Sequence, residues 1–169
     1  MTTQETAPPK AQAKLPPRWF IRAAWVVHRA MVRLTGGRFG LRPASDKTWG
    51  MMRLRTVGRR SAKPREAILG FYEDGPNIIT MAMNGWGEPE PAWWLNLQAN
   101  PDTIVELPDG SRPVHGRAAT PEERPGLWAR WASYDGPEKL ESWASRRPRE
   151  TAVVILEPRS DATGRPDAQ

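Results

Sequence analysis

Two pairs of β-rich segments, each joined by a tight turn, constrain the fold of this chain more than any other feature. One turn contains Asp74-Gly75 and the other contains Asp109-Gly110. An Asp-Gly step between two β-rich runs is typical of a hairpin, whose strands must be antiparallel. The expected paired strands cover residues 66–72 with 77–83, and 103–107 with 112–119.

Two further strands and three helices complete the expected elements. The apolar residues between Trp19 and Leu34 recur at three and four residues, which predicts an amphipathic helix. Thr120 and Glu123 have the spacing of a capping box. Because the strand–helix–strand alternation of a parallel sheet is absent, we predict an α+β domain built on an antiparallel barrel of about six strands. These further strands are expected at 49–56 and 151–156, and the helices at 18–35, 91–99 and 120–133.

The composition indicates one domain of ordinary size within the 169 residues. Proline-rich residues 1–17 and residues 160–169 are expected to be disordered tails, which leaves 18–159 for the domain. The chain has no cysteine, so disulfides and thiolate metal sites are excluded, and no metal site is expected. No export signal or run of about 20 apolar residues is visible, and we expect a cytoplasmic protein.

A basic segment follows the first expected strand. The net charge of +6 predicts attraction to anions, and residues 54–65 concentrate that charge around Gly58 and Ser61. A turn of this kind can direct backbone N–H groups and guanidinium groups at phosphate or carboxylate oxygens. The alternative is a solvated surface turn. The basic side chains belong to Arg55, Arg59, Arg60, Lys63 and Arg65.

A second segment, residues 81–97, combines glycine with tryptophan. An expected strand runs into a loop that contains Gly85 and Gly87, and the loop runs into a helix that contains Trp93 and Trp94. Glycine allows close approach of the backbone to a ligand, and indole rings provide aromatic walls. This arrangement suits a flat heteroaromatic ring, although the tryptophans could equally cover the barrel.

Together these segments resemble the deazaflavin-dependent nitroreductase and quinone reductase family. The resemblance covers about residues 19–159, and it rests on the order and spacing of separate motifs. They are Thr-Val-Gly-Arg-Arg-Ser-Ala-Lys-Pro-Arg at 56–65, Asn-Gly at 84–85, Pro-Ala-Trp-Trp-Leu-Asn-Leu at 91–97, Asn-Pro at 100–101 and Glu-Thr-Ala-Val-Val-Ile-Leu-Glu-Pro at 150–158. The chain differs from relatives in Arg60 and Ala62, where lysine and glycine are frequent. It also has Tyr134 and Trp143 in place of a tyrosine cluster on the substrate side.

The resemblance implies a split β-barrel and reduced coenzyme F420, a deazaflavin with an anionic phospholactyl and oligoglutamate tail. It implies transfer of a hydride to an electron-poor acceptor such as a quinone, an enone or a nitroaromatic. By position, the tail would be held by Arg59, Arg60, Ser61, Lys63 and Arg65. The ring would be bordered by Ala82, Met83, Asn84, Gly85 and Trp93. Asn84 and Tyr134 are weak candidates for steadying developing negative charge, and no residue is assigned as a catalytic acid or base.

Several alternatives stay open at this stage. The same barrel could carry a deazaflavin, flavin or haem without turnover, and FMN could replace F420. Nucleic acid is not expected, because the tryptophans are not interleaved with a basic strand. The arginine-rich helix at 18–35 could contact an anionic membrane surface, although packing on the barrel is favoured. His28 and His115 have no expected carboxylate partner. A monomer and a homodimer are equally compatible with the sequence.

Overall fold

The computed structural model describes residues 40–160 of the chain. The helix expected at 18–35 and the tail expected at 1–17 lie outside the described residues. The tail expected at 160–169 also lies outside them, apart from Ser160. The limits of the domain therefore stay predictions.

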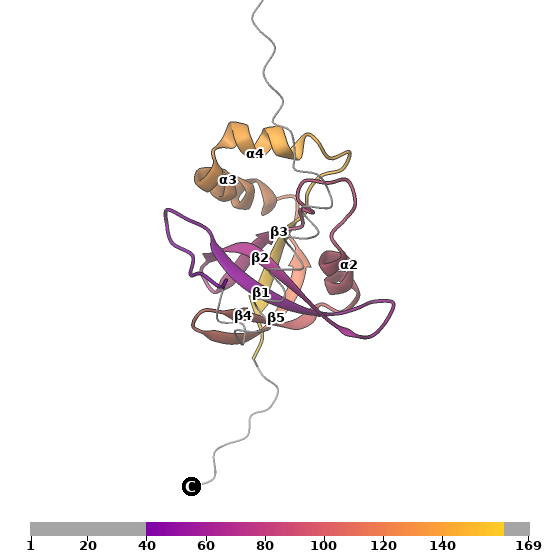
Figure 1. The fold of residues 1–169 in the computed structure, drawn as a ribbon. Helices are drawn as coiled ribbons and strands as arrows, with labels where there is room; N and C mark the ends of the chain where they lie inside the picture. Colours follow the sequence, from indigo (N-terminus) through magenta and orange to yellow (C-terminus); the bar gives the residue numbers. More distant parts are fainter. Residues whose placement is uncertain (1–39, 161–169) are drawn as a thin grey trace, which may run out of the picture. The chain divides into compact units, whose positions relative to one another are not determined.

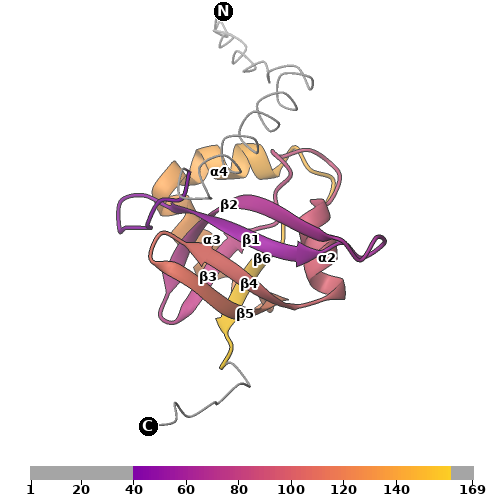
Figure 2. The ribbon, with the colours of Figure 1, turned by 60° about the horizontal axis from the view of Figure 1, so that its bottom comes forward.

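Six antiparallel strands close into a barrel in the order β1-β2-β3-β6-β5-β4, as Figures 1 and 2 show from two sides. All six strands were expected from the sequence, and the α+β split-barrel class is confirmed. The strands are β1 (Gly50–Val57), β2 (Pro64–Asp74), β3 (Asn77–Met81), β4 (Asp102–Leu107), β5 (Gly110–Ala118) and β6 (Val153–Pro158).

Both expected hairpins form. Asp74 pairs with Asn77 across the first turn, where Gly75 adopts a φ of +57°. Such a left-handed conformation is easily reached only by glycine, which explains the residue at this turn. Leu107 pairs with Gly110 across the second turn. Strand β6, the last in the sequence, then lies between β3 and β5 and joins the two hairpins.

Strands β3 and β6 are buried on both faces. Ile78 and Leu156 belong to the cluster that fills the barrel, and Ile79 and Ile155 belong to a second cluster beneath the helices. Burial of one such side chain stabilises the fold by about 1.5–3 kcal/mol. Double burial explains why residues 151–156 are an almost uninterrupted apolar run rather than an alternating one.

Helix α2 (Ala92–Ala99) packs on the barrel through its apolar side chains. Gly116 on β5 allows this close approach, because a Cβ atom there would lie 2.5 Å from the Cδ2 of Leu97. Trp93 and Trp94 join the same cluster, with ring centroids 6.2 Å apart. The helix was expected at 91–99, and only its first residue differs.

Helices α3 (Arg124–Asp135) and α4 (Pro137–Ala144) cover the second cluster, and Figure 1 shows them together above the barrel. Trp131 meets Tyr72 of β2 edge to face, with centroids 5.5 Å apart. The Tyr72 hydroxyl donates a hydrogen bond of 2.9 Å to the Leu127 carbonyl, and burial raises the pKa of Tyr72. No described helix is long and apolar enough to cross a membrane.

The sequence analysis missed α4 and placed the start of α3 too early. The expected capping box forms. Thr120 N donates to Glu123 Oε2 at 2.8 Å, and Glu123 N donates to Thr120 Oγ1 at 3.3 Å. The intervening residues form a turn, and α3 begins only at Arg124. Helix α4 was missed because it is only eight residues long and directly follows α3 at Gly136.

Candidate cofactor site

The basic segment forms the turn between β1 and β2. Gly58 N donates to the Lys63 carbonyl at 2.9 Å, and the N–H groups of Ser61 and Ala62 both donate to the Gly58 carbonyl, at 3.1 and 2.7 Å. A Cβ atom on Gly58 would lie 2.6 Å from Ser61 Oγ and 3.3 Å from the Lys63 carbonyl oxygen, so a larger residue here would displace the Ser61 side chain. Ala62 adopts a φ of 52°, a conformation that disfavours residues with a side chain.

A buried amide on α2 fixes this turn. Asn96, which is 5% exposed, accepts a hydrogen bond of 3.1 Å from Arg59 N through Oδ1. Its Nδ2 donates to Thr56 Oγ1 at 3.4 Å. Buried amides require such partners, so Asn96 holds the turn against the helix. The sequence analysis did not assign Asn96 a role. The available signal was a polar residue within the apolar run of 91–97.

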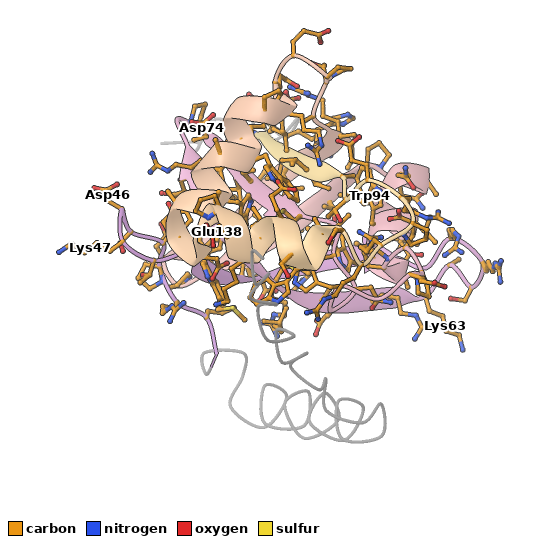
Figure 3. The ribbon with its side chains drawn as sticks, turned by 90° about the horizontal axis from the view of Figure 1, so that it is seen from above. Asp46, Lys47, Lys63, Asp74, Trp94 and Glu138 are labelled. Carbon is orange, nitrogen blue, oxygen red and sulfur yellow. The ribbon has the colours of Figure 1, made fainter. Side chains whose placement is uncertain are left out.

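The charged side chains of this turn are exposed and available to an anion. Arg59, Arg60, Lys63 and Arg65 are all exposed, and none forms an ion pair with a described residue. Figure 3 shows Lys63 pointing away from the barrel, on the opposite side from Asp46 and Lys47. Exposed guanidinium and ammonium groups on a rigid turn are suited to phosphate and carboxylate oxygens. We call residues 58–65 the basic turn.

The second expected segment begins where β3 ends. Ala82 N donates to the Ala152 carbonyl at 2.9 Å, and Gly87 N donates to the Asn84 carbonyl at 2.9 Å. Within this four-residue turn, Gly85 and Trp86 adopt φ values of 55° and 61°. We call residues 82–91 the glycine loop. Gly85 is exposed, and a Cβ there would meet no atom of residues 40–160 within 4 Å, so these residues leave the backbone open to a flat ligand.

A buried arginine supports the glycine loop from behind. The side chain of Arg147 has no exposed surface, and its Nη1 donates to the Ala82 carbonyl at 2.9 Å and to Thr151 Oγ1 at 2.7 Å. Its Nη2 lies 3.5 Å from Glu90 Oε1. Arg147 therefore connects the start and the end of the loop to the segment that precedes β6. The sequence analysis did not single out Arg147, because nothing in its neighbourhood distinguishes it from Arg146 and Arg149.

The remaining expected residues occupy three different surroundings. Trp93 is 8% exposed within the barrel cluster, so it supports the loop more than it presents an open ring face. Asn84 is exposed on the loop. Tyr134 lies on α3, packs 6.0 Å from Tyr72, and its hydroxyl accepts a hydrogen bond of 3.3 Å from Arg130 Nε.

Helix α2 brings the two segments together. The glycine loop runs directly into its first turn, and Asn96 about one turn later holds the basic turn. The structure thus presents exposed cations on one side of α2 and a loop with accessible backbone at its start. This donor set fits a ligand with a flat ring and an anionic tail, which is the composition of a deazaflavin coenzyme.

One expectation about the histidines is wrong. His115 does have a carboxylate partner, because its Nδ1 lies 2.7 Å from Asp102 Oδ1 across the β4–β5 pair. Asp102 also pairs with Arg159 at 3.2 Å. The side chains of His115 and Asp102 are each about half exposed. His28 lies outside the described residues.

A closed antiparallel barrel with a cationic turn and a glycine loop beside one helix defines a small split-barrel protein with a candidate site for an anionic cofactor. Residues 25–158 match the model of the F420H(2)-dependent quinone reductase family. The chain belongs to that family, whose cofactor is coenzyme F420.

Individual relatives agree with this assignment. The F420H(2)-dependent quinone reductase Rv1261c of Mycobacterium tuberculosis is 28% identical over 146 residues, which cover 82% of this chain and 95% of the relative. The M. tuberculosis protein Rv3178 is 36% identical over 103 residues, covering 60% of this chain and 83% of the relative. A solved F420-H2 dependent reductase, FDR-A, is similar with a TM-score of 0.56 and 26% identity, over 63% of this chain and 93% of that chain.

Proposed function

We propose that this protein is an oxidoreductase that uses reduced coenzyme F420 to transfer a hydride to an electron-poor acceptor. Quinones are the first acceptor class to consider, since the family is described as quinone reductases; enones and nitroaromatics are further candidates. The observation that carries the proposal is the basic turn: its four cationic side chains are exposed and lack ion pairs among residues 40–160, and the Arg59 backbone of the turn is held to α2 by Asn96.

The residue roles follow from position and chemistry. The phosphate and glutamate carboxylates of the tail would be bound by Arg59, Arg60, Ser61, Lys63 and Arg65. The ring would be bordered by Ala82, Met83, Asn84, Gly85 and Trp93. Each charge-assisted hydrogen bond would contribute about 1.5–3 kcal/mol.

The difficult chemistry belongs to the cofactor, which when bound supplies the hydride. The protein then has to hold the ring, exclude water and steady charge on the acceptor. The exposed Asn84 amide can donate a hydrogen bond to an acceptor oxygen as negative charge develops. The Tyr134 hydroxyl accepts a hydrogen bond from Arg130, so its own proton is free to be donated in the same way.

Two matched lysine variants test the assignment. Lys63→Ala removes a cation from the basic turn, and Lys47→Ala removes one from the opposite side in Figure 3. Titration with reduced F420 should show about tenfold weaker binding for Lys63→Ala and unchanged binding for Lys47→Ala. Equal effects of both variants would argue against tail binding at the basic turn.

Turnover is measured by adding menadione to the complex and following reoxidation of the cofactor by absorbance. Enzyme-dependent reoxidation would establish the reductase, and menadione, a nitroaromatic and an enone compared at equal concentration would rank the acceptors. Tight binding without reoxidation of any acceptor would instead indicate a carrier of the cofactor. Binding of FMN or haem in preference to F420 would overturn the assignment.

The proposed cellular setting is the cytoplasm, with the helix expected at 18–35 as a possible peripheral contact with the membrane. Sedimentation with anionic vesicles at low salt, before and after removal of residues 1–36, tests that contact. The choice between monomer and homodimer is open to light scattering. One solved structure of similar fold, described as a domain-swapped dimer, has a TM-score of 0.58 and 24% identity, which shows the fold alone.

A further inference from the structure

A cavity of about 470 Å³ lies between α3, α4 and the segment that leads into β6. It shares no lining residue with the basic turn or the glycine loop. Small-molecule sites have volumes of about 300–1,000 Å³, so the cavity is large enough for a small organic ligand. Its polar wall is formed by Arg124, Trp128, Glu141, Arg147, Arg149 and Glu150.

One guanidinium group in this wall has donors that a ligand can reach. Arg149 is exposed and forms neither an ion pair nor a hydrogen bond within residues 40–160. The guanidinium of Arg147 is fully buried behind the wall and is out of reach of a ligand. An exposed guanidinium without a partner can bind a carboxylate group through two parallel hydrogen bonds.

The other polar groups of the wall are already engaged. Arg124 pairs with Glu150, and its guanidinium lies 4.6 Å above the Trp128 ring. Trp128 Nε1 donates to Glu141 Oε1 at 2.7 Å. These contacts fix the shape of the cavity, and among its described lining residues they leave Arg149 as the accessible guanidinium without a partner.

The charge and the apolar surface of the lining residues favour one class of ligand. Glu141 and Glu150 would repel a doubly charged phosphate more strongly than a singly charged carboxylate. Trp128, Ala144 and Pro148 provide apolar lining for the body of the ligand. We propose that this cavity is a binding site for a small aromatic monocarboxylate, held by Arg149.

Benzoate is a suitable probe, and the indole N–H resonance of Trp128 is a local readout. The resonance is assigned by its loss in Trp128→Phe. At constant ionic strength, benzoate should shift this resonance in a saturable manner. Acetate, benzyl alcohol and inorganic phosphate should each bind at least about tenfold more weakly, because each lacks either the apolar body or the single carboxylate charge.

Neighbouring residues give matched charge controls. Arg149→Gln should weaken benzoate binding about tenfold, whereas Arg146→Gln, which changes an exposed residue that does not line the cavity, should leave it unchanged. Glu150→Gln should strengthen binding, and Glu138→Gln on the surface of α4 should not.

Three results would overturn the proposal. One is the absence of a saturable shift with benzoate. Another is an equal shift with benzyl alcohol, which would show an uncharged apolar pocket. The third is an equal loss of affinity in the Arg149 and Arg146 variants, which would show only general attraction to the basic surface. None of these measurements requires F420, so their outcome is independent of the proposed reductase activity.

Discussion

The guanidinium of Arg147 donates a hydrogen bond of 2.9 Å to the carbonyl oxygen of Ala82, a residue 65 positions earlier in the chain. This contact joins the segment before β6 to the first residue of the glycine loop. Since Ala82 N is bound to the Ala152 carbonyl, both polar groups of the Ala82 backbone have a partner. The loop therefore starts from a rigid position, although its tip at Gly85 is exposed.

Replacement of Arg147 by glutamine should lower both stability and cofactor affinity. The substitution leaves the carboxylate of Glu90, whose side chain is only 16% exposed, without its cation. Loss of one partner from a buried ion pair costs about 3–5 kcal/mol, so we expect a fall of about 3 kcal/mol in the free energy of unfolding. Arg146→Gln is the control, with an expected change within about 0.5 kcal/mol.

Denaturant unfolding measures the first effect, and calorimetric titration with reduced F420 measures the second. If Arg147→Gln lost stability but bound F420 as the wild type does, Arg147 would support the fold and not the site.

Asn96→Ala should loosen the basic turn. The substitution removes the acceptor for Arg59 N and the donor to Thr56, and we expect a loss of about 1–3 kcal/mol. Hydrogen exchange at the Arg59 amide should accelerate, and affinity for F420 should fall. Gln98→Ala, at an exposed position on the same helix, provides the control. Unchanged exchange at Arg59 would show that the turn holds its shape without Asn96.

Much of the fold could be predicted because its signals are local. The turns at Gly75 and Gly110, the apolar run of 151–156 and the Thr120–Glu123 capping pair all depend on residues close in sequence. The order of strands around the barrel could not be derived from the residues alone. It depends on β6 pairing with both β3 and β5, contacts that join residues far apart in the chain.

The cofactor-binding residues stay predictions. The charge density around Gly58 indicated an anion site or a solvated turn, the pattern of glycine and tryptophan at 81–97 indicated a site for a flat ring, and the resemblance to a family supplied the cofactor. The supporting residues Asn96 and Arg147 were missed, because their roles depend on burial and on partners that only the folded structure brings near. The pairing of His115 with Asp102 was missed for the same reason, since it depends on the register between β4 and β5.

Ala62→Gly should stabilise the protein. Ala62 is held at a φ of 52°, where an L-residue with a side chain is strained by about 1–2 kcal/mol. Part of the gain is offset by the greater entropy of glycine in the unfolded chain, which leaves a stabilisation of about 0.5 kcal/mol. Ala129→Gly, at an exposed position inside α3, should instead destabilise by about 1 kcal/mol. Thermal unfolding of the Ala62→Gly and Ala129→Gly variants measures both changes in stability. A loss of stability in Ala62→Gly would show that the backbone at residue 62 is not strained.

The capping pair at the start of α3 should make stability depend on pH. Hydrogen bonds from Arg117, at 2.7 and 2.8 Å, and from the Thr120 backbone lower the pKa of Glu123 from 4.5 to about 2. Because the pKa is lower in the folded state, the stabilisation is complete above pH 4.5 and is lost as the pH falls towards 2. The difference in Tm between the wild type and Glu123→Gln should shrink over that range. A difference that stayed constant with pH would contradict the assignment.

The position of β6 between β3 and β5 also means that the barrel cannot close before the last strand of the chain has paired. Until residues 153–158 pair, β3 and β5 each lack one neighbouring strand. A strand without a neighbour has a row of unpaired backbone N–H and C=O groups, which other chains can bind. Pairing of β6 therefore covers two exposed strand edges at once.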